Sequence, residues 1–146
     1  MKILNIFATM QEVPCERAIC ISAYGCPLKC KGCSWKDENK SREFTLDDLN
    51  KILNKYKNGL ASCICFLGGE WNPDFIHYVK LCKKEGYKTC LYTGLDTYND
   101  PEIIKHLDYL KTGHWDELKG GLDSKETNQK FMNVKTNESM NKYFWR

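Results

Sequence analysis

Short apolar runs separated by amphipathic segments predict strands that alternate with helices. Ala18–Ala23 and Cys63–Leu67 are almost continuously apolar, which is typical of short strands buried on both faces. Residues 88–93 and 107–111 repeat this pattern, and a further strand is predicted near residues 131–134. The segment 26–42 is rich in Lys, Gly and Pro without periodicity, which predicts a loop.

Three helices are predicted between these strands. A T-x-x-D capping box at Thr45 is followed by leucines and isoleucine at helical spacing, so a helix is expected to run to about residue 57. Asn72-Pro73 has the pattern of an N-cap followed by a first helical residue, and Gly86 is expected to end that second helix. Residues 101–106 suggest a short third helix.

Helices between successive strands imply right-handed crossovers and a parallel sheet. Four crossover strands are too few to close an eight-stranded barrel. We therefore predict an α/β fold: an open, incomplete (β/α) barrel with a mostly parallel, curved sheet. Residues 1–146 are expected to form one domain, because no repeat or linker interrupts them.

Composition fits a globular protein, with 42% hydrophobic and 12% aromatic residues in a chain of 146. The net charge of +3 is spread among interspersed acids and bases, which argues against a nucleic-acid partner. No run approaches the roughly 18 apolar residues of a membrane span, and the first ten residues lack the features of a signal peptide. A cytoplasmic protein without a membrane or nucleic-acid partner is the expectation.

Cysteine is unusually frequent in this chain and is the most informative part of its composition. Nine cysteines without a secretion signal argue against a disulfide framework and favour metal or redox chemistry. Cys26, Cys30 and Cys33 form a C-x3-C-x2-C pattern on the loop after the first predicted strand. Three thiolates can hold one iron–sulfur cluster and leave one iron open to a small chelating ligand. A zinc site is the alternative, and it would need the pair Cys63-x-Cys65, which together with Cys82 and Cys90 is expected in the core.

The cysteine loop resembles that of the radical S-adenosylmethionine (SAM) enzymes, and Gly68-Gly69-Glu70 resembles their GGE motif, which binds the SAM amino group. A narrower resemblance is to the activating proteins of anaerobic ribonucleotide reductase. It rests on Pro14-Cys15-Glu16-Arg17, Tyr92-Thr93-Gly94 and Thr127-Asn128-Gln129-Lys130-Phe131, which are similar to the G-P-G-x-R, Y-T-G and T-N-Q-R-F segments of that group. Cys15 departs from the pattern, which has Gly at this position.

The resemblance implies a [4Fe–4S] cluster held by the three loop cysteines, with SAM on the fourth iron. Reductive cleavage of SAM would give a 5′-deoxyadenosyl radical that takes a hydrogen atom from a glycine of the reductase. Lys111 could pair the SAM carboxylate, although a solvated surface lysine is the favoured interpretation, and Asn128 could reach the ribose on similar terms. The full set of predicted SAM contacts is Gly32, Ser34, Gly68, Gly69, Glu70, Thr93, Lys111 and Asn128.

The resemblance also implies partners. The large subunit of anaerobic ribonucleotide reductase would be the protein substrate, and a flavodoxin- or ferredoxin-like protein would supply the electron. Two other classes of function stay open. One is a radical SAM enzyme acting on a small molecule or on another glycyl-radical enzyme, and the other is a zinc or iron–sulfur binding module without catalysis.

Overall fold

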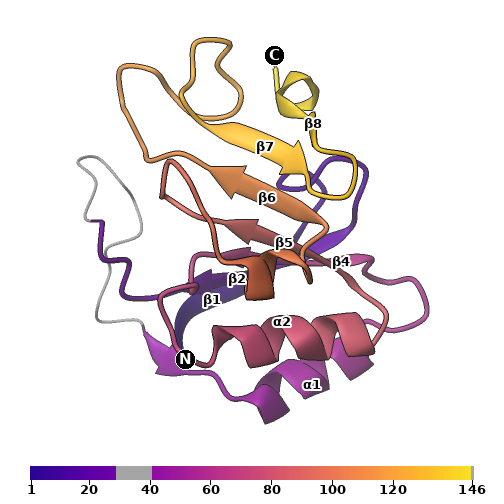
Figure 1. The fold of residues 1–146 in the computed structure, drawn as a ribbon. Helices are drawn as coiled ribbons and strands as arrows, with labels where there is room; N and C mark the ends of the chain where they lie inside the picture. The colour runs from indigo at the N-terminus through magenta and orange to yellow at the C-terminus, as the bar shows by residue number, and fades with distance from the viewer. Residues whose placement is uncertain (29–40, 146) are drawn as a thin grey trace.

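The chain is built around one open sheet. In a computed structural model, which describes residues 1–28 and 41–145, eight strands lie in the order β3-β1-β2-β4-β5-β6-β7-β8 (Figure 1). The four central strands are parallel: β2 (Ala18–Ala23), β4 (Cys63–Leu67), β5 (Lys88–Tyr92) and β6 (Tyr109–Thr112). The predicted open α/β fold with a parallel sheet is confirmed.

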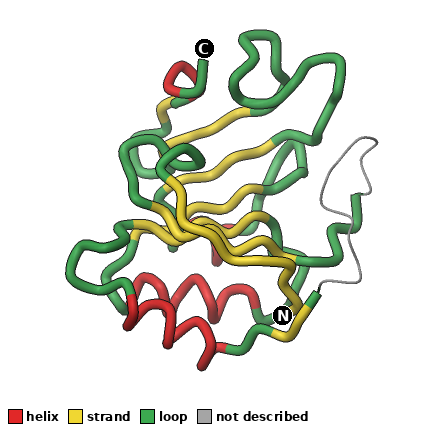
Figure 2. The backbone as a smooth tube through the Cα atoms, turned by 180° about the vertical axis from the view of Figure 1, so that it is seen from behind, coloured by secondary structure: helices red, strands yellow, loops and turns green. Residues whose placement is uncertain are grey.

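Three helices connect the parallel strands in succession: α1 (Leu46–Lys55), α2 (Phe75–Lys84) and α3 (Pro101–Ile104). The two long helices, α1 and α2, lie side by side on one face of the sheet (Figures 1 and 2). Ile103 of α3 belongs to the same buried cluster, so α3 covers this face too. In the described part of the chain, every helix is too short or too polar to cross a lipid bilayer.

The capping box that begins the first helix is confirmed. The backbone N–H of Asp48 donates to Thr45 Oγ1 at 3.1 Å, and the N–H of Thr45 donates to Asp48 Oδ2 at 2.8 Å. The predicted start of the second helix is wrong by two residues, because Asp74 is its N-cap. Asn72 instead donates from Nδ2 to the carbonyl of Gly69 at 3.0 Å, and so closes the turn that follows β4.

Antiparallel strands flank the parallel centre. The predicted strand near residues 131–134 is confirmed as β7 (Lys130–Asn133), which pairs with β6. Three strands were not predicted: β1 (Lys2–Thr9), which pairs with β2, and the two-residue strands β3 (Arg42–Glu43) and β8 (Glu138–Ser139) at the edges. A short 3-10 helix, η2 (Asn141–Tyr143), follows β8.

The two faces of the sheet have separate cores. Ile19, Ile64 and Phe66 face the helices, and alternate residues face the other way. The face away from the helices, which we call the helix-free face, is covered by Val13 and by the C-terminal tail, where the rings of Phe131 and Phe144 lie 5.2 Å apart. Four cysteines are buried on the helix-free face: Cys20, Cys63, Cys65 and Cys90. Three of these lie level with one another on the neighbouring strands β2, β4 and β5, namely Cys20, Cys65 and Cys90.

The core between the sheet and the helices provides a test of stability. Leu53 of α1 is 0% exposed, whereas Leu46 on the same helix is 40% exposed. We expect Leu53→Ala to lower the free energy of unfolding by about 2–5 kcal/mol, because it leaves a cavity in a packed core. The same substitution at Leu46 should cost less than about 1 kcal/mol. Urea denaturation followed by circular dichroism measures both, and equal losses would contradict this packing.

Candidate functional site

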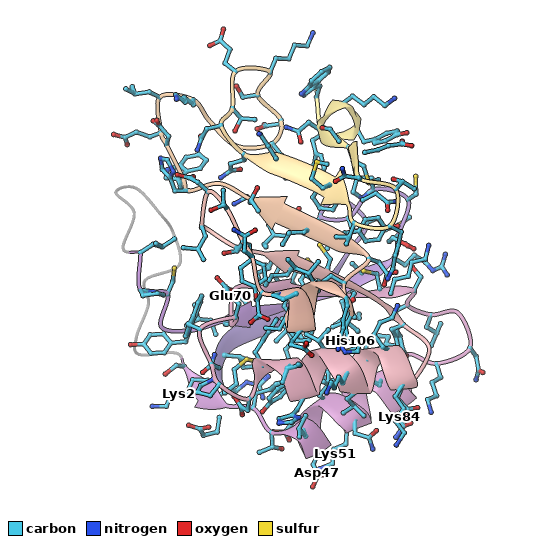
Figure 3. The ribbon with its side chains drawn as sticks, viewed as in Figure 1. Lys2, Asp47, Lys51, Glu70, Lys84 and His106 are labelled. Atoms are coloured by element: carbon cyan, nitrogen blue, oxygen red, sulfur yellow. The ribbon has the colours of Figure 1, made fainter. Side chains whose placement is uncertain are left out.

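The carboxyl ends of the four central strands meet at one edge of the sheet, which we call the carboxyl edge. This edge is where open α/β sheets bind ligands. The first predicted cluster ligand, Cys26, follows β2 there and is partly exposed. Glu70 follows β4 on the same side of the molecule as the segment that leaves β2 (Figure 3).

The start of the cysteine loop packs against the turns that follow β4 and β5. A Cβ atom on Gly94 would lie 2.5 Å from Leu28 Cδ1, and one on Gly25 would lie 3.8 Å from Trp71 Nε1. Cys26 therefore lies between residues that contact both turns. The other four predicted loop residues are outside the described residues, so their roles stay predictions: Cys30, Gly32, Cys33 and Ser34. In the described part, no group of three or more His, Cys, Asp or Glu side chains could hold a metal.

Two glycines shape the turn after β4. Gly68 has φ +83° and Gly69 has φ +104°, a region that L side chains rarely adopt. A Cβ on Gly68 would lie 2.7 Å from the ring of Trp71, and one on Gly69 would lie 3.1 Å from Met1 Sδ. The turn is tied to the next strand, because the N–H of Gly68 donates to the carbonyl of Tyr92 at 2.9 Å. Both positions thus require glycine, and the turn presents Glu70 at the carboxyl edge.

The carboxylate of Glu70 is only half satisfied. Its Oε1 accepts a hydrogen bond from Thr93 Oγ1 at 2.8 Å. Its Oε2 is buried and has no hydrogen-bond partner among the described residues. Burial raises the pKa of Glu70, although the bond from Thr93 and the charge of Lys111 oppose this shift. A buried, unpartnered carboxylate oxygen is costly, and a ligand ammonium would complete it.

Lys111 is part of the same edge. Its side chain is buried, with 8% of the residue exposed, so the solvated surface alternative for Lys111 is wrong. Its Nζ donates to the carbonyl of Gly113 at 2.7 Å and to that of Thr93 at 3.3 Å. These bonds hold a positive charge close to Glu70, whose carboxylate it influences. Contact with the SAM carboxylate stays a prediction.

Asn128 extends the edge past β6. Its Nδ2 donates to the carbonyl of His114 at 3.1 Å, while its Oδ1 is buried without a partner among the residues described. Gly113 lies against it, since a Cβ there would be 3.0 Å from the Asn128 carbonyl. The four residues predicted from separate segments therefore follow one another along one edge: Glu70, Thr93, Lys111 and Asn128. Trp115, which no sequence pattern singles out, also has a buried Nε1 without a partner within the described chain.

The comparison with protein families decides the class. The model of the radical SAM superfamily matches residues 20–141, from β2 to η2. The chain belongs to the radical SAM superfamily. A comparison with curated proteins gives no match. Membership in the radical SAM superfamily supports a SAM-cleaving radical enzyme and implies a [4Fe–4S] cluster and SAM as its cofactors.

The described residues fit these radical SAM cofactors. The unpartnered oxygen of Glu70 suits an ammonium, and the two glycines leave room for a ligand close to the backbone. The zinc alternative fits poorly, because Cys63 lies level with Ala18 at the start of β2 whereas Cys26 follows its end. The length of β2, roughly 16 Å, therefore separates the level of Cys63 from that of Cys26. Burial also raises the pKa of Cys63, which disfavours the thiolate that zinc needs.

One departure from the family pattern has a structural answer. Cys15 stands where the resembling segment has Gly, and it keeps φ +65°. This left-handed conformation, which favours glycine, is adopted here by a cysteine at a conformational cost that glycine would avoid. The side chain is exposed, so Cys15 places a thiol at the surface.

Glu70 generates a test of the ammonium site. We expect Glu70→Gln to weaken SAM binding about 10- to 100-fold, because it removes a charge-assisted hydrogen bond while keeping an acceptor for Thr93. Because the pKa of Glu70 is raised above its usual value of 4.5, the carboxylate takes up a proton at a higher pH than an exposed glutamate does. Wild-type affinity should therefore fall as the pH is lowered from 7 towards 5, and the affinity of the variant should stay flat.

The same raised pKa sets the sign of the stability effect. The carboxyl of Glu70 binds its proton more tightly in the folded protein than in the unfolded chain. Its contribution to the stability of the protein is therefore lost as the pH rises from the usual pKa through the raised one. Glu70→Gln should thus leave the free energy of unfolding at pH 7 equal or higher. Calorimetric titration of SAM and urea denaturation measure the two effects, with the exposed Glu138→Gln as the matched control. A variant that binds SAM normally would contradict the assignment.

Proposed function

We propose that this radical SAM protein is an activase that generates a glycyl radical on anaerobic ribonucleotide reductase. The observation that carries the proposal is the position of the residues that resemble the activating proteins. Thr93 of the Y-T-G segment donates to Glu70, and Asn128 of the T-N-Q segment lies beside Gly113 at the same edge. The subgroup-like segments therefore lie at the carboxyl edge, where we propose that SAM binds.

Each group at the carboxyl edge has a role in this proposal. Cys26, Cys30 and Cys33 hold the cluster. Glu70 accepts the SAM ammonium and is itself oriented by Thr93, and Lys111 supplies positive charge for the carboxylate. When bound, the cluster and SAM would supply the radical chemistry, and the protein would position them.

A protein substrate needs an open approach, and the sheet provides one. The eight strands of the described chain do not close into a barrel. A cavity of about 640 Å³ opens on the helix-free face, and its lining includes Glu12, Tyr92 and Gln129. It is adjacent to the carboxyl edge, because Lys111 lies over the ring of Tyr92 at 5.9 Å. In this proposal the glycine-bearing segment of the reductase approaches from this face.

The electron is proposed to come from a flavodoxin- or ferredoxin-like protein. Such donors are acidic, and Lys29 and Lys31 flank the second cluster cysteine in the sequence. The reaction would take place in the cytoplasm, where the thiols stay reduced.

The proposal is tested by radical transfer under anaerobic conditions. The protein is reconstituted with iron and sulfide, reduced with dithionite, and mixed with SAM and the reductase. We expect 5′-deoxyadenosine by chromatography and a glycyl doublet by electron paramagnetic resonance. Cys26→Ala should abolish both, because it removes a cluster ligand.

The outcomes separate the three classes of function. 5′-Deoxyadenosine without a doublet on the reductase would overturn the activase and leave a radical SAM enzyme with another substrate. A protein that binds zinc tightly and cannot assemble a cluster would leave only the binding module.

A further inference from the structure

Two polar atoms near the end of the carboxyl edge lack partners. Trp115 Nε1, a hydrogen-bond donor, and Asn128 Oδ1, an acceptor, are both buried, and neither is bonded to any described residue. Unpartnered buried polar atoms are rare in folded proteins and call for a reason. Here the two unsatisfied atoms are of complementary type, and both belong to the connection between β6 and β7.

The side chain of Asn128 is bonded to the chain immediately before Trp115. Asn128 donates from Nδ2 to the carbonyl of His114, the residue before Trp115, at 3.1 Å. This bond also orients the amide, since the atom facing a carbonyl must be the nitrogen. Gly121 contacts both stretches of the connection: a Cβ there would be 3.6 Å from the Trp115 ring and 3.8 Å from Oε1 of Gln129, the residue after Asn128. The donor and the acceptor thus come from two stretches of one connection that pack on each other.

Their position relative to Glu70 points to a particular part of SAM. Glu70 follows β4, and moving past β5 and β6 to the stretch before β7 takes three steps between neighbouring strands. At about 4.8 Å per step this is roughly 14 Å. The ammonium and the base are at opposite ends of SAM, and the ribose lies between them. A ligand that reaches from Glu70 to Asn128 would therefore present its base there, beside the stretch that holds Trp115.

We propose that Trp115 and Asn128 recognise the adenine base of SAM. The indole N–H donates to the ring nitrogen N1, and the amide oxygen accepts from the exocyclic amine. Adenine offers an acceptor and a donor side by side on this edge, which complements the two atoms. The predicted contact of Asn128 thus changes from the ribose to the base, and Trp115 is a new contact. This inference rests on the use of SAM by the superfamily and not on the identity of the protein substrate.

The pairing makes a prediction about base selectivity. Hypoxanthine has a carbonyl in place of the amine and an N–H at N1, so it would place donor against donor and acceptor against acceptor. Each mispaired, buried group carries a desolvation cost. We expect the wild-type protein to bind SAM about 10- to 100-fold more tightly than the inosyl counterpart of SAM.

The test uses the cluster-loaded protein with the cluster oxidised, so that SAM binds without being cleaved. Calorimetric titration measures the affinities of SAM, its inosyl counterpart and free methionine. Trp115→Phe keeps the ring but removes the donor, and should weaken SAM binding about 3- to 10-fold. The double variant Trp115→Phe/Asn128→Ala should bind both nucleoside ligands with affinities within about threefold of each other. Methionine, which occupies only the Glu70 end, should bind all variants equally.

Trp145→Phe is the matched control, since Trp145 is 44% exposed in the C-terminal tail and should leave every affinity unchanged. The proposal is overturned if the double variant keeps the wild-type preference for adenine. It is also overturned if both nucleoside ligands and methionine weaken together, because that would indicate a structural role. Neither result depends on whether a glycyl radical forms.

Discussion

The candidate site depends on a buried carboxylate that the fold leaves half satisfied. Thr93 bonds one oxygen of Glu70, and the other oxygen has no partner in the described part of the chain. Two glycines with positive φ hold the carboxylate at the carboxyl edge, in a turn where any other side chain would be strained and crowded. Such a group costs free energy while it lacks a partner, and a ligand ammonium would restore the missing bond.

The parallel register explains why residues from four segments form one site. β2, β4, β5 and β6 run in the same direction and begin and end at similar levels, so the residues that follow them lie along a single edge. The apolar strands below the edge are buried on both faces and supply the stability that unsatisfied polar groups at the edge reduce. Rigid strands and short turns thus fix side chains that are far apart in sequence.

Much of this could be predicted from the sequence, and the failures have physical causes. Continuous apolar runs identified the central strands, because strands buried on both faces leave no room for polar residues. β1 was missed, since it alternates irregularly and is stabilised by pairing with β2 rather than by its own pattern. The burial of Lys111 and the unpartnered N–H of Trp115 depend on packing between distant segments, which no local pattern reveals.

The nine cysteines show how burial assigns different roles to one residue type. Cys65 and Cys90 lie inside the sheet, where burial raises the pKa of both, that of Cys90 to about 11. Such thiols stay protonated and act as small apolar side chains. Cys26 follows a strand at the edge and is partly exposed, in contrast to the core cysteines. Burial thus disfavours the core cysteines as metal ligands, although the core contains more cysteines than the predicted cluster loop.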